Sequence, residues 1–322
     1  MKPGAVAGRS GLIHEAGFYG SDKELLELSV PFLLAGLETG ELALAVFSGP
    51  RAALVRDALP DPSPVIFIDS DQRYQRPAVA IRMYRELVAE QLASGVPRLR
   101  AAGEVPHPGV GAPWPGWAQY EAVVNRVFAA FPLWGRCLYD TRTTPYDVLD
   151  DVGRTHPWLT RPNGEASPNA DFQDPALFLR SRFAAPPDPL EGTAPVIALV
   201  DPRPSVARVA VRATALACGI GHDEVDELVA AVQEAVVNAL VHGKRPVRLR
   251  VWVGLQRIVV AVTDRGRGPS DPFAGLVPAS DNPHGGFGLW LVHQLCRQVT
   301  MSRDEHGFTI RMIAGGGPSR RF

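Results

Sequence analysis

Long apolar runs, cysteines and clustered basic residues are all scarce in this chain. No segment approaches the length and apolarity of a membrane span, and residues 1–20 contain no apolar core of signal-peptide length. The three cysteines, Cys137, Cys218 and Cys296, share no metal-ligand spacing and leave one unpaired in any disulfide scheme. We therefore expect a cytoplasmic protein without a membrane segment, whose reduced cysteines are small buried packing residues.

The charge balance excludes a strong electrostatic partner. Lys and Arg number 33 against 34 Asp and Glu, which gives a formal net charge of -1. No basic patch is longer than Lys244-Arg245, so direct DNA binding is not expected. The chain of 322 residues is long enough for two domains, each with its own core.

A proline-dense stretch marks the expected domain boundary. Residues 184–193 contain Pro186, Pro187 and Pro189 and offer little to bury, which is typical of a semi-rigid linker. We expect one domain over residues 1–183 and a second over residues 194–322.

Residues 1–183 alternate apolar runs with amphipathic stretches. Ser21 followed by Glu24 predicts a helix N-terminus, and the apolar run at residues 42–47 predicts a buried strand. Further strands and helices alternate up to Asp140, so we expect an open α/β sheet with helices on both faces. The loop at residues 48–51 lacks the Gly-Lys-Ser/Thr of a phosphate-binding loop, which argues against an NTPase in this half.

Several polar residues in this half are open to two interpretations. Asp140 ends a predicted strand, and the carboxyl ends of strands are where open α/β sheets form clefts. His14 is more often a core histidine than a ligand. Glu121 and Asn125 lie one helical turn apart and fit a solvated or interdomain pair.

Short motifs in this half resemble the methanogen/methylotroph sensory domain family, of which DcmR is the type. The motifs are His14, Phe18-Tyr19, Gly36-Leu37, Gly40-Glu41, Tyr120-Glu121, Asn125, Tyr139-Asp140 and Thr155-His156-Pro157. The resemblance implies a degenerate RecA-like α/β sensory domain of bacterial regulators that binds a small organic ligand. We take His14, Tyr19 and Asp140 as the candidate sensory site.

In the second half, residues 223–243 have the strongest helical pattern. Apolar residues recur at intervals of three and four, as in an amphipathic helix with a wide buried face. Glu234, Asn238 and His242 follow one another at intervals of four and therefore project from one side. A carboxylate beside a carboxamide can orient a hydroxyl and complete the shell of an oxygen-preferring divalent cation.

Two glycine clusters follow this helix. Asp264, Gly266 and Gly268 come directly after a predicted strand, where a carboxylate can accept a hydrogen bond from an exocyclic amine and glycines leave room for a flat ring. The second cluster, residues 285–288, opens a helix at residues 289–298 whose N-terminus suits phosphates. Residues 269–284 suit a lid. We expect an α+β domain with its helices on one face of a mixed sheet.

This order of motifs resembles the GHKL (Bergerat) ATP-binding sandwich. The sequence of residues 234–243 resembles that of the anti-sigma factor serine kinases. The resemblance implies that Asn238 holds Mg²⁺, Glu234 is the catalytic base, and Asp264 recognises adenine with water-mediated support from Thr309. The remaining residues that it implies for ATP binding are His242, Gly266, Gly268, Gly285, Gly286, Phe287, Gly288 and Leu289. Phe287 stands where related regulators often carry a basic residue.

The resemblance implies an anti-sigma regulatory factor with ATP and Mg²⁺ as cofactors. Such a protein phosphorylates a STAS-type anti-anti-sigma protein, sequesters a sigma factor and often forms a homodimer. No histidine-bearing helical hairpin precedes the predicted ATP domain, which disfavours an autophosphorylating histidine kinase. Two alternatives remain: a non-catalytic ATP-binding partner-switching module, and a small-molecule sensor with a vestigial ATP domain.

Overall fold

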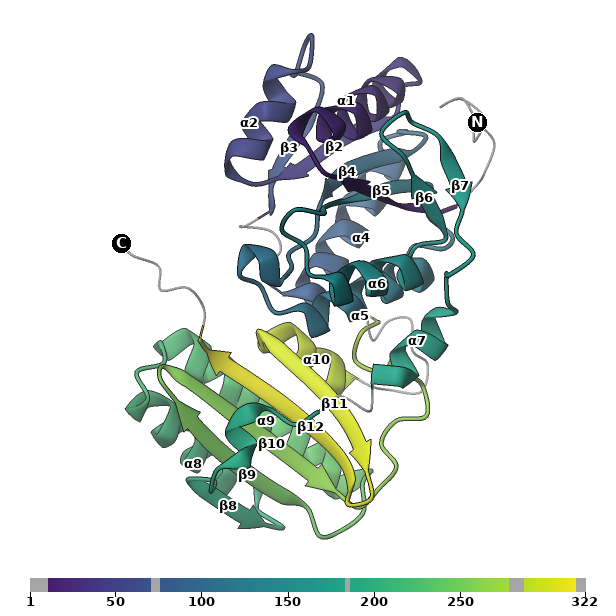
Figure 1. Cartoon of the computed structure of the whole chain (residues 1–322). Coiled ribbons are helices and arrows are strands. Elements are labelled where there is room, and N and C mark those ends of the chain that lie inside the picture. The colour runs from purple at the N-terminus through teal and green to yellow at the C-terminus, as the bar shows by residue number, and fades with distance from the viewer. Residues whose placement is uncertain (1–10, 71–75, 183–185, 278–286, 317–322) are drawn as a thin grey trace. The chain divides into compact units, whose positions relative to one another are not determined.

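The computed structural model describes residues 11–70, 76–182, 186–277 and 287–316. The chain divides into two compact units, residues 1–178 and 179–322 (Figure 1). Each unit has its own sheet and its own buried core. None of the helices in the described part of the chain has both the length and the apolarity needed to cross a membrane.

The first unit alternates strands and helices along its whole length. Its elements are β1 (Ile13–Tyr19), α1 (Asp22–Glu38), β2 (Leu42–Phe47), α2 (Gly49–Asp57), β3 (Ile66–Asp69), α4 (Pro77–Ala93), β4 (Leu99–Glu104), η1 (Pro108–Val110), α5 (Trp114–Val127), β5 (Leu133–Asp140), α6 (Tyr146–Thr155), β6 (Trp158–Thr160), β7 (Ala166–Pro168) and α7 (Pro175–Ser181), which crosses the boundary between the units.

The seven-stranded sheet of this unit has the order β3-β2-β4-β5-β1-β6-β7. Neighbouring strands are parallel except for β6 and β7, which are antiparallel. Helices α1 and α2 lie on one side of the sheet, and α4, α5 and α6 lie on the other (Figure 1). The expectation of an α/β sheet covered on both faces is thus confirmed.

The sequence predicts most of these elements because local signals agree with the fold. Ser21 caps α1, and its hydroxyl oxygen accepts a hydrogen bond from the Glu24 backbone N–H at 3.3 Å. Strand β1 is the exception. The buried polar residues His14 and Glu15 interrupt its apolar pattern, so residues 13–19 do not read as a core strand.

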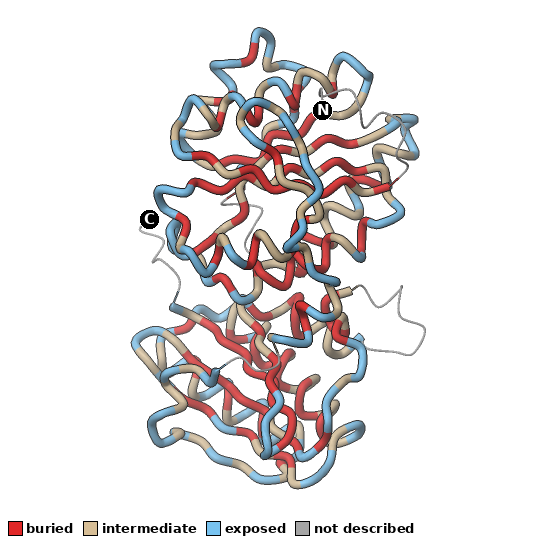
Figure 2. Tube along the Cα trace, turned by 45° about the vertical axis from the view of Figure 1, so that its right-hand side comes forward, coloured by how far each residue is buried: buried red, intermediate tan, exposed pale blue. Residues whose placement is uncertain are grey.

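The second unit places three helices against one sheet. Its elements are η3 (Pro189–Gly192), β8 (Ile197–Val200), α8 (Pro204–Ala217), α9 (His222–Val241), β9 (Arg248–Gly254), β10 (Arg257–Asp264), α10 (Phe287–Leu295), β11 (Gln298–Asp304) and β12 (Gly307–Gly315). Side chains of α8, α9 and α10 share one core cluster with the sheet, and the red, buried segments of Figure 2 follow this interface.

The five-stranded sheet has the order β11-β12-β10-β9-β8, and each described pair is antiparallel. The expected α+β domain is present, but the expectation of a mixed sheet is wrong. The sequence pattern shows which residues alternate across a strand, not which way the neighbouring strand runs. Helix α8 begins without a side-chain cap: its N-cap is Arg203, with Pro204 in the first turn.

The described part of the proline-rich stretch is packed against the second sheet. Leu190 of η3 joins the apolar cluster around Trp252 on the outer face of the sheet. Asp188 forms an ion pair with Arg257, and Glu191 with Arg311. Residues 188–192 therefore cover the face of the sheet opposite the helices, which differs from the expected semi-rigid linker.

Candidate functional site

Helix α9 provides the polar ladder of the second unit. Its apolar side is buried in the core, from Val225 to Ala239. Glu234 and Asn238 lie one turn apart on a partly exposed side of the helix. The helix ends at Val241, and its C-cap His242 is exposed and donates its backbone N–H to the Asn238 carbonyl at 2.8 Å.

The start of α10 lies directly against this ladder. A Cβ atom on Gly288 would come within 2.9 Å of Asn238 Nδ2 and 3.0 Å of Glu234 Oε2. Residue 288 must therefore leave room for these two side chains, and glycine does so. The positive end of the α10 dipole is thereby brought beside a carboxylate and a carboxamide.

Asp264 closes β10 near the C-terminal end of α9. Its Oδ1 atom accepts two hydrogen bonds, from the backbone N–H groups of Gly266 at 2.5 Å and of Lys244 at 3.0 Å. A Cβ on Gly243 would lie 2.4 Å from Asp264 Cγ. Asp264 is 5 % exposed, and these bonds fix its carboxylate in place.

The other predicted residues are placed as follows. Gly268 has a φ of +66° and leaves no room for a side chain beside Phe308. Phe287 is exposed at the start of α10 with its ring 5.6 Å from that of Trp290, and Leu289 packs against the core. Gly285, Gly286 and residues 278–284 of the expected lid lie outside the described residues.

Thr309 does not face Asp264. In the β10–β12 ladder Thr309 pairs with Thr263, and the two hydroxyl oxygens are 2.8 Å apart. Asp264 pairs with Phe308 and so lies on the opposite side of the sheet. The water-mediated support that the resemblance implies is therefore wrong for this chain, in which backbone N–H groups hold Asp264.

In the first unit, Tyr19 and Asp140 lie together. They are register partners at the carboxyl ends of β1 and β5. Arg51, from the first turn of α2, contacts Asp140 Oδ2 at 2.6 Å and Glu104 at 3.0 Å, and the Tyr19 hydroxyl donates to Glu104. The result is a polar group at the strand ends, where open α/β sheets form clefts.

Burial and charge shift the pKa values of this group in opposite directions. Burial and the neighbouring Glu104 raise the pKa of Tyr19 above its usual range. Burial also raises the pKa of Glu104, despite the Arg51 charge. Burial alone would raise the pKa of Asp140, but hydrogen bonds from Arg142 and the charge of Arg51 outweigh it and lower that pKa.

The start of α2 differs from a phosphate-binding loop. In that fold position a lysine would face the phosphates. Here Arg51 stands in the first turn of the helix and is held by two carboxylates, Glu104 and Asp140. The Arg51 guanidinium is thus already paired with two carboxylates, and that the first half is not an NTPase stays a prediction.

His14 lies away from Tyr19 and Asp140. It is five residues from Tyr19 along β1, which corresponds to roughly 16 Å and to the opposite face of the sheet. Its imidazole joins Glu121, Cys137 and His156 in one buried cluster. The three candidates for the sensory site are therefore not brought together.

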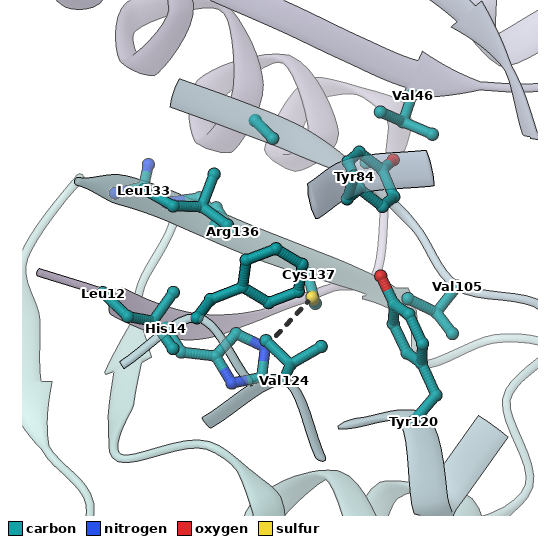
Figure 3. A pocket seen from close by; sticks show the side chains of 14 residues that line it. Leu12, His14, Val46, Tyr84, Val105, Tyr120, Val124, Leu133, Arg136 and Cys137 are labelled. Carbon is teal, nitrogen blue, oxygen red and sulfur yellow. Dashed lines mark hydrogen bonds between the residues drawn. The ribbon is translucent and has the colours of Figure 1, made fainter. Parts of the chain in front are cut away.

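Cluster members affect each other's ionisation. Burial alone would raise the pKa of Glu121, but His156 and His14 outweigh it and lower that pKa. Burial and the Glu121 charge raise the pKa of the Cys137 thiol. Burial and His14 lower the pKa of His156 to about 3. Beside the cluster is a cavity of about 50 Å³ whose lining includes His14, Cys137 and Tyr120 (Figure 3).

Glu121 and Asn125 are not the solvated or interdomain pair that their spacing suggests. Glu121 is fully buried, and Asn125 Oδ1 is 3.1 Å from His14 Nδ1. The sequence does not connect Cys137 and His156 with His14, because they lie more than 120 residues further along the chain. The available signal was alternation: Cys137 and Tyr139 lie two apart on β5 and therefore share the face that meets α5.

Comparisons with known proteins agree with this architecture. Residues 13–157 match the methanogen/methylotroph, DcmR sensory domain (MEDS), and residues 200–314 match the histidine kinase-like ATPase domain. No curated protein matches the chain.

Among solved structures, the chain is similar to the RsbU and RsbW domains of a Mycobacterium tuberculosis protein. Sequence identity is 20% and the TM-score is 0.28, over 38% of this chain and 32% of that chain. The chain thus spans about a third of that structure.

The family matches and the two sheets with their helices point to one domain order. The chain joins an N-terminal sensory domain of the MEDS family to a C-terminal histidine kinase-like ATPase domain of the GHKL fold.

Proposed function

We propose that this protein is an anti-sigma regulatory factor whose C-terminal domain is an ATP-dependent serine/threonine protein kinase. Its substrate would be a STAS-type anti-anti-sigma protein, and its other partner a sigma factor that the same domain sequesters. The MEDS domain would control both activities. The observation that carries the proposal is the closeness of Gly288 to both Glu234 and Asn238, whose side chains fill the space that a Cβ on residue 288 would take. A carboxylate, a carboxamide and a helix N-terminus therefore lie side by side.

The donor set fits Mg²⁺ with ATP. Oxygen atoms of Asn238 and Glu234 lie 3.2 and 3.0 Å from the point where a Cβ on Gly288 would stand, and Mg²⁺ prefers oxygen ligands. Asn238 would hold the ion, which supplies charge neutralisation at the phosphates when bound. Residues 287–288 at the start of α10 would bind phosphate oxygens through backbone N–H groups.

Asp264 would recognise adenine. Its Oδ1 atom is engaged by the N–H groups of Gly266 and Lys244, so Oδ2 can accept from an exocyclic amine. Gly266 is buried and Gly268 adopts a left-handed conformation, which keeps side chains away from the ring. Base recognition and phosphate binding would then occur at opposite ends of the same stretch of α9.

In the transfer itself, Glu234 would orient the attacking serine or threonine hydroxyl and accept its proton. The hydroxyl oxygen would form a bond to the γ-phosphorus as the bond to the β–γ bridging oxygen breaks, releasing ADP. Positioning and electrostatic stabilisation supply most of the rate in such reactions. The chain contributes the Glu234 carboxylate and the start of α10, held together by the packing of α10 on α9.

The test is phosphoryl transfer from labelled ATP to a panel of STAS-domain proteins from the same organism. We expect the native protein to label one of them on serine or threonine. Glu234→Gln should retain ATP binding and lose at least about 100-fold in transfer rate. Glu305→Gln, an exposed residue of the β11–β12 turn, is the matched control and should transfer normally.

The outcomes separate kinase from binding module. If ATP binds but no STAS protein is labelled, the domain is the non-catalytic ATP-binding module. If Glu234→Gln transfers as fast as the native protein, Glu234 is not the base. Light scattering of the purified protein, alone and with sigma factors, tests the expected homodimer and the sequestration complex.

A further inference from the structure

The MEDS domain contains four side chains of metal-binding types in one largely buried cluster. They are His14 on β1, Glu121 on α5, Cys137 on β5 and His156 directly after α6. One donor atom from each lies within 4.8 Å of the others. We propose that these four residues form a closed binding site for a divalent transition metal, with Zn²⁺ as the occupant. The proposal is independent of the kinase activity proposed above.

The spacing of the donor atoms fits a tetrahedron. Ligands about 2.0–2.3 Å from zinc lie about 3.3–3.8 Å from one another in tetrahedral geometry. His14 Nε2 is 3.2 Å from Glu121 Oε2, and His156 Nε2 is 3.4 Å from the same oxygen. Cys137 Sγ is 3.5 Å from His14 Nε2 and 3.7 Å from Glu121 Oε2. These four separations match tetrahedral edges to within about 0.1 Å, and the other pairs lie within 4.8 Å.

Hydrogen bonds outside the cluster aim both imidazoles inward. His156 Nδ1 is 2.9 Å from the Val152 carbonyl, an acceptor, so this nitrogen carries the hydrogen. Asn125 donates from Nδ2 to the carbonyls of Thr155 and Glu121, which makes its Oδ1 the acceptor for His14 Nδ1. In its neutral form each ring therefore turns an unprotonated Nε2 into the cluster, as metal-binding histidines do.

These assignments leave too few hydrogens at the centre. Two imidazole lone pairs approach Glu121 Oε2, whose partner oxygen Oε1 is occupied by the Tyr139 hydroxyl at 2.5 Å. His156 Nε2 is buried and has no hydrogen-bond partner among the described residues. The Cys137 thiol, 3.7 Å from Glu121 Oε2, is a single weak donor for these acceptors. Converging acceptors with so few hydrogens are costly in a dry interior, and a cation removes that cost.

The charge balance selects the ion. A divalent ion that binds would displace the Cys137 thiol proton, and the thiolate and the Glu121 carboxylate then carry two negative charges that the ion cancels within a largely buried site. One thiolate, two imidazoles and one carboxylate together favour zinc over magnesium or calcium. Because all four ligands come from the protein, the ion would hold β1, β5, α5 and the end of α6 together rather than bind a substrate directly.

The first experiment measures metal content on tag-free, full-length protein that has not been exposed to chelators. We expect about one zinc per chain by mass spectrometry of the dissolved sample. After replacement by Co²⁺, we expect an intense thiolate-to-cobalt charge-transfer band and the visible bands of a tetrahedral ion. X-ray absorption on the zinc form should show one sulfur and three nitrogen or oxygen neighbours.

Variants locate the ion. Cys137→Ser should lose the charge-transfer band and most of the bound zinc, whereas Cys218→Ser, in the other domain, should keep both. Circular dichroism checks that each variant is folded. If Cys137→Ser is unfolded, the sulfur neighbour in the native X-ray absorption spectrum still decides. Native protein without stoichiometric zinc that also shows no charge-transfer band on adding Co²⁺ would overturn the proposal, as would a band that survives Cys137→Ser.

Discussion

Gly288 and Asn238 lie so close together that a Cβ on residue 288 would be 2.9 Å from Asn238 Nδ2. The atoms in the way are the ends of two flexible side chains, those of Asn238 and Glu234, rather than backbone. A methyl group at this position should therefore displace the side chains without unfolding the domain. This contact links the second glycine cluster to the α9 ladder.

We predict that Gly288→Ala weakens Mg-ATP binding by at least about tenfold while the unfolding temperature changes little. The displaced Asn238 and Glu234 would no longer present their oxygens to the phosphates and the ion. Calorimetric titration measures the affinity. Gly192→Ala, where a Cβ meets nothing within 4 Å, is the matched control and should bind as the native protein does.

Asp264→Asn should reduce ATP affinity by about tenfold to a hundredfold. An amide at this position can still accept through oxygen, but its NH₂ group would then face either Gly266 N–H or the adenine amine, both of which are donors. The exposed Asp226 on α9 supplies the control, Asp226→Asn. Equal affinities for the two variants in calorimetry would remove Asp264 from the site.

Arg51→Met should lower the free energy of unfolding of the MEDS domain by about 1–3 kcal/mol. The change removes the cation that Glu104 shares with the 1 % exposed Asp140, which then keeps only Arg142. Urea denaturation at pH 7 measures the loss. Arg56→Met, on the same helix with its guanidinium 4.2 Å over the Phe67 ring, should cost less than about 1 kcal/mol. Similar losses in both variants would show that the carboxylates do not need Arg51.

His293 should make the ATPase domain sensitive to acid. Burial on α10 lowers its pKa to about 4, and its Nε2 atom has no partner among the described residues. Between pH 6.5 and 4 the unfolded chain therefore takes up a proton that the folded domain excludes, and stability falls as the pH falls. The loss should reach on the order of 2–3 kcal/mol near pH 4 and be absent above pH 7.

The pH dependence is isolated by comparing urea denaturation of the native protein with His293→Gln, which cannot titrate. We expect a flatter pH profile in the variant over this window. His306→Gln, in the exposed β11–β12 turn, should leave the native profile unchanged. Parallel profiles for native protein and His293→Gln would mean that the residue does not oppose protonation.

The sequence predicts elements well where local chemistry and burial agree. The amphipathic period of α9 and the Ser21 cap are both visible along the chain, because residues three and four apart meet on a helix. Strand β1 is missed because its buried Glu15 pairs with Arg136, 121 residues away, at 2.8 Å. A charged residue reads as exposed until its partner is known.

The residues that we propose for ATP binding occur in compact motifs. Glu234 and Asn238 share a helix face, and Asp264 stands directly before its glycines. The prediction that Thr309 supports Asp264 is wrong, because the register of β12 against β10 decides on which face of the sheet a residue lies. The pairing partner, and not the motif, sets that register.

By itself the sequence determined the two-domain order, the α/β and α+β classes and the short motifs whose glycines and acidic residues we propose for ATP binding. Each of these follows from short-range periodicity and spacing. Only the tertiary structure decided that His14 lies beside Glu121, Cys137 and His156 and not beside Tyr19 and Asp140. The parallel pairing of β1 with β5, and the packing of α5 against one face of the sheet, bring together residues that are up to 142 positions apart in the chain. No local pattern records such contacts, because the chain between them is free to vary.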